Sequence, residues 1–329
     1  MLFLGTKTYP NENEYSSFLA AHGGTSNAYT DSEDTIYYFD VASEYLNEAL
    51  DRFSCFFKFP LFAQSSTDRE LNAIESEHSK NINNDGFRLY QLDRNLLNRS
   101  HPMNRFATGN KFTLEVYPKK QNINVRDSLL NFHSKYYSAN QMTLCVLGRE
   151  PLDTLDKYVR SHFSSVPTNN RPDVALSWWG TQPYDSQRSA RLLQVVPISP
   201  QRRLTLSWPI WIQTPLVRQA INVNKPDVIL AHLLGHEGGG SVRSVLIRNG
   251  WANDIQAYAG EDVSDYQVFE VSMDLTPKGL RNYERVVSVV FAYIHLLVEK
   301  GIPDYIVDEV RCGAGEPFRV FRRPDLAVL

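Results

Sequence analysis

The chain has 329 residues, of which 42% are apolar, and a formal net charge of −3. This length is ample for a globular core and favours two domains over one. A balance so close to neutral implies no broad basic surface and argues against a nucleic acid partner. The cysteines are few and far apart, so no disulfide framework or Cys-rich zinc site is indicated, and a reducing compartment such as the cytoplasm fits best; mitochondria and peroxisomes stay open. They are Cys55, Cys145 and Cys312.

The first half of the sequence alternates helical spacing with short β-type runs. Apolar periodicity predicts helices over residues 11–21, 46–59, 65–80, 86–97, 125–137 and 151–163. Alternation and turn residues predict strands over residues 26–30, 35–41 and 142–147. Asn11 suits the N-cap of the first helix, and the residues Ser65, Ser66, Thr67 and Asp68 suit the start of the third.

Residues 166–186 change character, because they are rich in Pro, Asn and Asp and show no sustained periodicity. We place a linker there, centred near Asp173, which divides the chain into domains 1–173 and 174–329. In the second half, strands are predicted over residues 192–198, 204–208, 255–259 and 266–273. Helices are predicted over residues 227–234, 241–249 and 278–299, with another that starts at Asp304. The fold class is therefore α+β.

The longest apolar run covers residues 286–298 and contains Ser288 and His295. It is too short to span a bilayer and predicts a buried helix. Beyond it, glycines and prolines from Gly313 to Pro324 break the last helix, and the sequence ends without a finishing element. Truncation of the chain or a gene-model error is the expected reason.

Glu70 and Glu77 are the first candidates for chemistry. Seven residues at about 100° each bring them to nearly the same helix face, two turns apart. One carboxylate there could bind a metal ion while the other supports it. On spacing alone, a solvated polar face is the stronger interpretation. His78 and Glu75 point to other faces and are poor co-ligands.

His232, His236 and Glu237 form a second candidate, because two histidines four residues apart can share a metal ion. His236 stands directly before three glycines, however, and the alternative is capping and packing at a helix end. The glycines followed by Ser241 also suggest a phosphate cradle, but the Lys of a P-loop is absent.

The third candidate is the short strand over residues 26–30, which follows two glycines and carries small polar residues. An exposed edge of this kind could accept an extended peptide by strand addition. An ordinary edge strand is the simpler alternative.

Several longer motifs then point to one family. They are LFLGTKTYP at 2–10, DRELNAIESEH at 68–78, HPMNRFATGNK at 101–111, VLGRE at 146–150 and LGHEG at 234–238. In this order they resemble insulysin-type members of the pitrilysin family of inverted zinc peptidases (inverzincins), over roughly residues 1–311. The resemblance implies a mitochondrial-processing-peptidase-like metallohydrolase fold, with two domains of antiparallel sheet packed with helices. It also implies zinc-dependent endopeptidase activity on small peptides.

The same resemblance implies that the sequence starts just after the zinc motif. In the family, zinc is held by both histidines of His-x-x-Glu-His and by a distant Glu, while the Glu within the motif activates water. Family members continue from the motif into MLFLG or close variants, and this sequence begins at that Met1. We therefore expect a fragment that neither holds zinc nor hydrolyses peptides alone. The alternative is a non-catalytic isoform that binds peptides or pairs with a homodimer partner or full-length homologue.

Site residues carry over from the resemblance position by position. Glu77 matches the third zinc ligand, and Glu70 matches the supporting carboxylate two turns earlier. The strand that pairs with substrate beside the zinc matches Asn27, Ala28 and Tyr29. The exosite that holds the substrate's N-terminal end matches His236, Glu237, Gly238, Gly239 and Gly240. Residues 256–258 (QAY) depart from the family's glycine-containing pattern, so the geometry of this exosite can differ.

Overall fold

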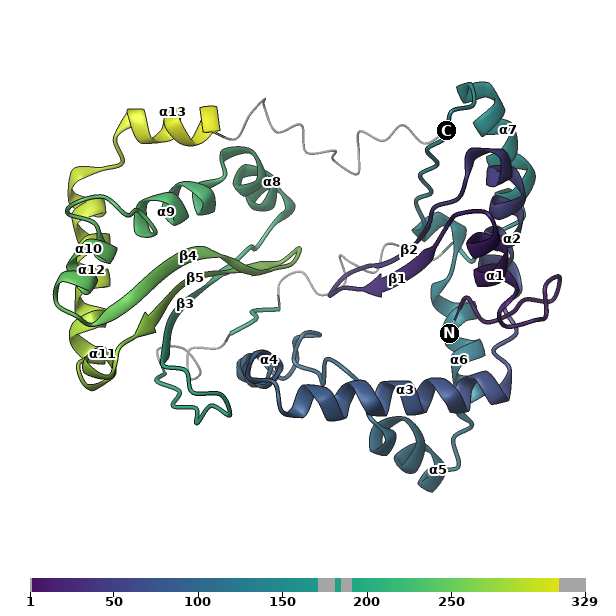
Figure 1. Ribbon diagram of the computed structural model, residues 1–329, viewed down its shortest axis with the longest axis horizontal. Helices are drawn as coiled ribbons and strands as arrows, with labels where there is room; N and C mark the ends of the chain where they lie inside the picture. The colour runs from purple at the N-terminus through teal and green to yellow at the C-terminus, as the bar shows by residue number, and fades with distance from the viewer. Residues whose placement is uncertain (1, 171–180, 185–190, 314–329) are drawn as a thin grey trace. The chain divides into compact units, whose positions relative to one another are not determined.

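The computed structural model describes residues 2–170, 181–184 and 191–313. The chain divides into two compact units, Met1–Trp178 and Trp179–Leu329, each with its own helices and sheet (Figure 1). The linker centre predicted at Asp173, like the end of the chain after Gly313, lies outside the described residues.

Helices dominate the first unit, and its one described sheet is the antiparallel hairpin β1–β2. Its elements in chain order are α1 (Glu14–Ala21), β1 (Ser26–Thr30), β2 (Thr35–Phe39), η1 (Ser43–Tyr45), α2 (Leu46–Lys58), α3 (Gln64–Ile82), α4 (Asp85–Leu96), the π-helical turn η2 (Phe112–Val116), α5 (Tyr117–Lys120), α6 (Val125–Tyr136), η3 (Ala139–Gln141) and α7 (Leu152–Phe163).

An aromatic core holds this unit together. Tyr15 of α1 packs edge-on against Phe56 of α2, with ring centroids 5.1 Å apart. Phe53, one helical turn earlier, lies 5.0 Å from Phe39 of β2. The predicted spacing of apolar residues along α2 therefore carries one helix face into the core.

The second unit contains a three-stranded antiparallel sheet in the order β3–β5–β4. Its elements are β3 (Arg203–Trp211), α8 (Pro215–Asn224), α9 (Pro226–Leu234), α10 (Val242–Arg248), β4 (Ala252–Asp262), β5 (Tyr266–Leu275), α11 (Pro277–Arg281), α12 (Tyr283–Lys300) and α13 (Asp304–Gly313).

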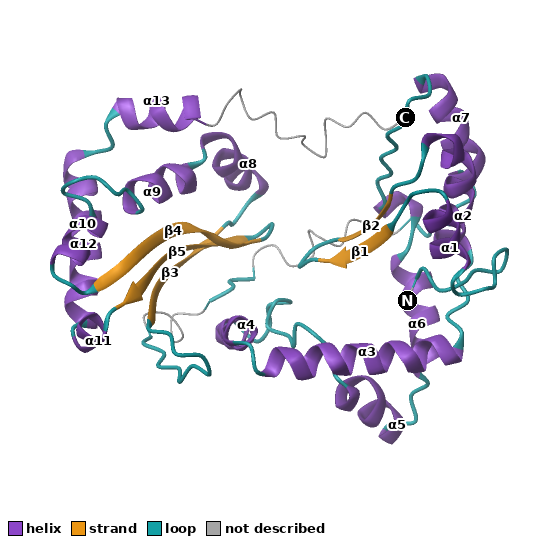
Figure 2. Cartoon of the chain, viewed as in Figure 1, coloured by secondary structure: helices purple, strands orange, loops and turns teal. Residues whose placement is uncertain are grey.

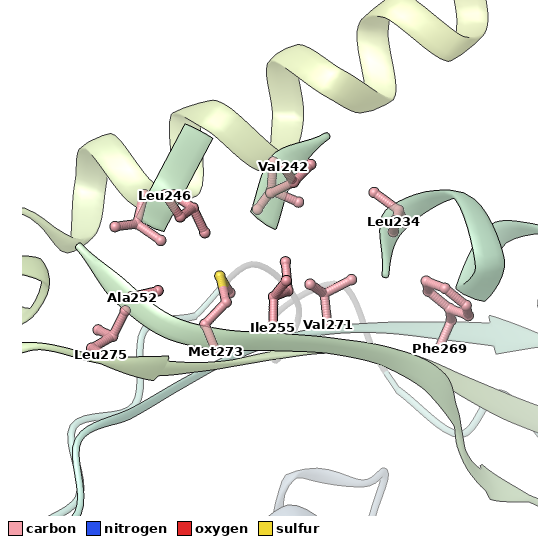
Figure 3. Close-up of a cluster of buried hydrophobic side chains, with 11 residues drawn as sticks. Leu234, Val242, Leu246, Ala252, Ile255, Phe269, Val271, Met273 and Leu275 are labelled. Atoms are coloured by element: carbon pink, nitrogen blue, oxygen red, sulfur yellow. The ribbon is translucent and has the colours of Figure 1, made fainter. Parts of the chain in front are cut away.

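Helices α9, α10 and α12 pack on one face of this sheet (Figure 2). Figure 3 shows Ile255, Val271 and Met273 pointing from the strands toward Val242 and Leu246 of α10. Val271 and Met273 are fully buried. Alternate residues of each strand point the other way, because side chains alternate across a strand. One face of the sheet is therefore apolar and covered by helices, while the other face carries the polar residues Glu270, Ser272 and Asp274 along most of β5 and the buried Tyr266 and Val268 near its start.

Two of the predicted strands are wrong. Residues 142–147 and 192–198 are largely exposed, with Leu147 exposed at 93% and Val196 at 84%, and neither segment belongs to a described strand. A β-prone sequence becomes a strand only when a neighbour completes the hydrogen-bond ladder. None of the described strands pairs with either segment.

Helix boundaries also differ from expectation. The first helix starts at Glu14, because the Asn11 side chain accepts the Asn13 N–H (2.9 Å) in a turn before it. The helix predicted over residues 278–299 breaks at Asn282, whose amide Nδ2 donates to the Lys278 carbonyl (2.8 Å). Helix α8 was not predicted, although Thr214 before Pro215 is a start signal: its hydroxyl accepts the Val217 N–H (3.3 Å).

Among the described residues, no single helix is long and apolar enough to cross a membrane. Helices α12 and α13 together have the length and apolar composition of a membrane span, but the chain bends by 111° between them.

His133 of α6 makes the stability of the first unit depend on pH. Its ring stacks on Tyr137 (4.7 Å between centroids) and meets the ring of Phe62, and burial lowers its pKa. The unfolded chain, with a His pKa of about 6.5, then binds a proton that the folded chain resists. The stabilising contribution is therefore present above the unfolded pKa and is lost as pH falls through the lowered folded pKa.

We expect the unfolding free energy of the first unit to fall by at most about 1.4 kcal/mol per pH unit within that window, because one proton is linked. The measurement is urea unfolding from pH 7.5 downward, beside His133→Gln, which does not titrate. Parallel pH profiles of the two proteins would contradict the role of His133.

Candidate functional site

The start of α3, the helix that carries Glu70 and Glu77, is held by charged neighbours. Ser66 and Thr67 are buried in its first turn and do not cap it, so the predicted capping is wrong. The Ser66 hydroxyl instead donates to the carboxylate of Glu12, which also pairs with Arg69. The Thr67 hydroxyl donates to the Ala63 carbonyl (3.1 Å).

Arg126 of α6 fixes the loop that leads into α3. Its guanidinium donates to the carbonyls of Phe62 (2.7 Å) and Leu61 (3.1 Å). Phe62 is buried and has a φ of 43°, a conformation that non-glycine residues adopt only where the surroundings hold it. Sequence patterns gave no signal for Glu12 or Arg126, because both act on α3 from other elements.

Glu70 and Glu77 both lie within α3, as predicted. Seven residues separate them, which is about 10 Å along a helix. Glu70 is half-buried and Glu77 is exposed. Their neighbours are engaged elsewhere: His78 contacts the Asn110 amide (3.4 Å), and Glu75 accepts the Lys111 N–H (2.5 Å). The expectation that His78 and Glu75 point away from the pair agrees with these contacts.

Zinc sites in proteins need at least three protein ligands. Within the part of the chain that the structure describes, no three His, Cys, Asp or Glu side chains come together to hold a metal ion. The two carboxylates of α3 therefore do not form a zinc site by themselves. The rings of His232 and His236 lie 5.9 Å apart, and no metal-binding group of three forms around them either.

Strand β1 presents backbone groups on its outer edge. In an antiparallel pair, hydrogen-bonded residues alternate with residues whose N–H and C=O point away from the partner strand. The Asp40 N–H donates to Thr25 (3.0 Å) and the Asp31 N–H to Asp34 (2.9 Å) at the two ends of the hairpin. By this alternation, Ala28 points its N–H and C=O outward, and its N–H donates to the Asn27 side-chain Oδ1 (2.8 Å).

The hairpin has one inner and one outer face. Tyr37 and Phe39 of β2 pack against the aromatic core, and Ala28 lies on the same face as Tyr37, its cross-strand partner. Tyr29 is 50% exposed on the opposite face, beside Ile36. Of the three predicted residues, only Ala28 directs its backbone groups to the outer edge, whereas the backbone groups of Asn27 and Tyr29 face β2.

The glycine-rich loop after α9 lies beside the outer strand β4. Residues of α9, the loop and β4 line an open depression of about 710 Å³; its lining includes His232, Gly235, His236, Glu237, Gly238, Asp254 and Gln256. The Gly238 N–H donates to His236 Nδ1 (3.0 Å). A Cβ on Gly238 would come within 2.5 Å of that ring, so any other residue there would displace the exposed His236 side chain.

The edge of β4 at this depression also has outward backbone groups. The Leu275 N–H donates to the Arg202 carbonyl, and the Ile212 N–H donates to the Asp265 carbonyl. The backbone groups of the odd-numbered β5 residues therefore point toward β3, and those of the even-numbered residues point toward β4. The backbone groups of their β4 partners Asp254, Gln256 and Tyr258 therefore bond to β5 within the sheet. Ile255 and Ala257 point their N–H and C=O outward.

Charges in the depression are mixed. Arg243 of α10 pairs with Asp254 (3.2 Å) and lies 4.0 Å from Glu237. Two carboxylates therefore share one guanidinium, which leaves one negative charge when the histidines are neutral. Asp254 and Arg243 were not predicted from the sequence, because their proximity arises from the packing of α10 on β4.

Comparison with known proteins places this architecture among the metallopeptidases. Residues 1–100 match the family model "Insulinase (Peptidase family M16)", and residues 124–312 match "Peptidase M16 inactive domain". The chain is 45% identical over 311 residues to the insulin-degrading enzyme of Bos taurus and 44% identical over 312 residues to the A-factor-processing enzyme of Saccharomyces cerevisiae. The crystal structure of pitrilysin covers 94% of the chain with a TM-score of 0.82 and 30% sequence identity; the chain covers 32% of pitrilysin.

The chain therefore belongs to peptidase family M16, the insulinase family of zinc metallopeptidases. The expected α+β fold with pitrilysin-like architecture is confirmed. The match covers 94% of this chain but about 30% of the length of the curated relatives.

Proposed function

We propose that this chain supplies part of a zinc-dependent endopeptidase that degrades small peptides. Glu77 acts as a zinc ligand, and Glu70, on the same helix face, supports it. The edge of β1 pairs with the backbone of an extended peptide. The observation that carries the proposal is the outward N–H of Ala28, which donates to the neighbouring Asn27 side chain and not to a strand.

The second unit offers a separate contact, for the N-terminal end of a peptide. The loop of His236, Glu237 and Gly238–Gly240 borders the β4 edge, where Ile255 and Ala257 offer backbone groups. The negative balance of Glu237 and Asp254 over Arg243 favours an N-terminal ammonium group. Both contacts, at the β1 edge and at the β4 edge, depend on strand addition. In strand addition, main-chain hydrogen bonds give the affinity, so peptides of different sequence can bind.

The chain alone is proposed to bind peptides without hydrolysing them. Its sequence contains no His-x-x-Glu-His, and α3 provides carboxylates without the two histidines and the water-activating Glu of that motif. Catalysis then needs those groups from elsewhere, and a full-length homologue or a homodimer partner is the alternative arrangement. Cys55 and Cys145 are free thiols, which suits a reducing compartment such as the cytoplasm.

Ala28→Pro tests the β1 edge. Proline lacks the N–H and is tolerated at an edge position whose N–H points away from the sheet, so the hairpin should persist. We expect labelled extended peptides to bind about tenfold or more weakly, from one lost backbone hydrogen bond and the bulk of the ring. Fluorescence anisotropy with the full chain measures this.

Ala28→Gly is the matched control, because it also alters the side chain but keeps the N–H. It should bind peptides within about threefold of the original chain. Equal binding by the Pro variant would move the peptide site away from β1. Cleavage of the peptides by the unaltered chain with added zinc would overturn the proposal that it binds without hydrolysing.

A further inference from the structure

The open face of the second sheet carries a tyrosine–glutamate pair next to the β4 edge. Tyr258 of β4 and Glu270 of β5 are cross-strand partners, and the Tyr258 hydroxyl is hydrogen-bonded to the Glu270 carboxylate. Burial and this carboxylate raise the pKa of Tyr258 to about 12, so the phenol keeps its proton and donates it. Tyr258 is still 40% exposed.

The Glu270 side chain lies over Gly260, which has no side chain of its own. A Cβ on Gly260 would lie 3.2 Å from the Glu270 carboxyl carbon, so the carboxylate leans over a position without a side chain. In the described part of the chain, no Lys, Arg or His nitrogen comes within the 4.0 Å of an ion pair with Glu270. Arg203, the cation that acts on Tyr258 from β3, lies opposite Asp274 instead. A half-buried carboxylate is thus held in place without a matching charge.

A peptide added to the β4 edge would pass directly beside this pair. Its backbone would bond to Ile255 and Ala257, whose groups point outward. The peptide residue next to Tyr258 would then direct its side chain to the open face, with Cβ atoms about 5 Å apart. Glu270 lies one strand further, about 10 Å from the peptide backbone, since adjacent strands are about 4.8 Å apart.

We propose that Tyr258 and Glu270 form a subsite for a basic side chain, Lys or Arg, of a peptide paired with the β4 edge; this rests on the peptide binding proposed above. The aliphatic stem of such a side chain packs across the exposed Tyr258 ring, as the stems of Lys and Arg do on apolar surfaces. Its charged end reaches the Glu270 carboxylate, which the tyrosine hydroxyl already orients. The subsite selects among peptides, whereas the backbone edge binds them.

The experiment compares matched peptides on the full chain. Extended peptides with a free N-terminus carry Lys, Gln or Glu at one position in turn, from the second to the fifth residue, and anisotropy gives each dissociation constant. At one position we expect Lys to bind about tenfold more tightly than Gln, and Glu more weakly than Gln. Glu270→Gln should reduce the Lys preference to within about twofold and leave the Gln peptide unchanged.

Tyr258→Phe separates the two parts of the subsite. It keeps the ring and removes the hydroxyl, so the Lys preference should fall by only about threefold. Glu284→Gln on α12 removes a carboxylate away from the edge and should change nothing, which controls for net charge. A Lys preference that is absent, or that survives Glu270→Gln, overturns the subsite while peptide binding stands. Failure of every peptide to bind, including the Gln series, instead removes the proposed binding on which the subsite rests.

Discussion

Glu77→Gln should remove most of the bound zinc from a chain extended to include the His-x-x-Glu-His segment and the rest of the peptidase. The change replaces the carboxylate proposed as a ligand by a neutral amide of the same shape, and α3 stays folded because Glu77 is exposed on it. Turnover should fall with the metal content. Zinc analysis after dialysis against a mild chelator, alongside peptide hydrolysis, measures both effects.

Glu70→Gln is the matched comparison, two turns earlier on the same helix. It should retain more zinc while activity falls by about 10–100-fold, the usual scale for a residue that supports a ligand. If Glu77→Gln keeps full zinc and Glu70→Gln loses it, the two roles are reversed. If neither variant changes zinc or turnover, this face of α3 is merely solvated.

Gly279→Ala should destabilise the second unit by about 3 kcal/mol, at the upper end of the cost of overpacking. A Cβ at Gly279 would lie 1.8 Å from the carbonyl oxygen of Trp251. That oxygen cannot simply move, because it accepts the Thr276 N–H (3.0 Å), and the Thr276 side chain caps α11. The clash therefore separates the start of β4 from the end of β5.

In the full chain, the melting temperature of the second unit should be lower by about 10 °C, while that of the first unit stays unchanged. Because two units rarely unfold as one two-state system, hydrogen exchange of β5 amides should assign the loss to this unit. Gly239→Ala is the control, since no atom lies within 4 Å of its Cβ and its stability should change by less than about 0.5 kcal/mol. Equal stability of the two variants would show that the close approach at Gly279 does not exist in solution.

Periodicity located most helices because their apolar stripes are local. Helices α2, α6, α7, α9 and α10 lie where the spacing of apolar residues places them. Periodicity failed for strands, because a strand forms only when it pairs with a neighbouring strand. Residues 142–147 and 192–198 have β-type composition, yet a strand exists only with a neighbour at hydrogen-bonding distance, and alternation cannot report that neighbour.

The candidate site shows the same division. The family resemblance singled out Glu70, Glu77, Asn27–Tyr29 and His236–Gly240, whereas spacing alone left each of them with a plain structural alternative. Sequence did not reveal Glu12 and Arg126 at the start of α3, or Asp254 and Arg243 beside the glycine loop, because these contacts join residues far apart in the chain or on different elements.

By itself, the sequence determined the family of this chain, its α+β class and the position of Glu70 and Glu77 on one helix face, because motifs and helical periodicity are written in consecutive residues. Tertiary structure alone decided which backbone groups are available to a peptide. The outward N–H of Ala28, the outward edge at Ile255 and Ala257, and the pairing of Tyr258 with Glu270 all follow from strand register. Register is set when strands meet across the sheet, and a shift of one residue would reverse every one of these assignments.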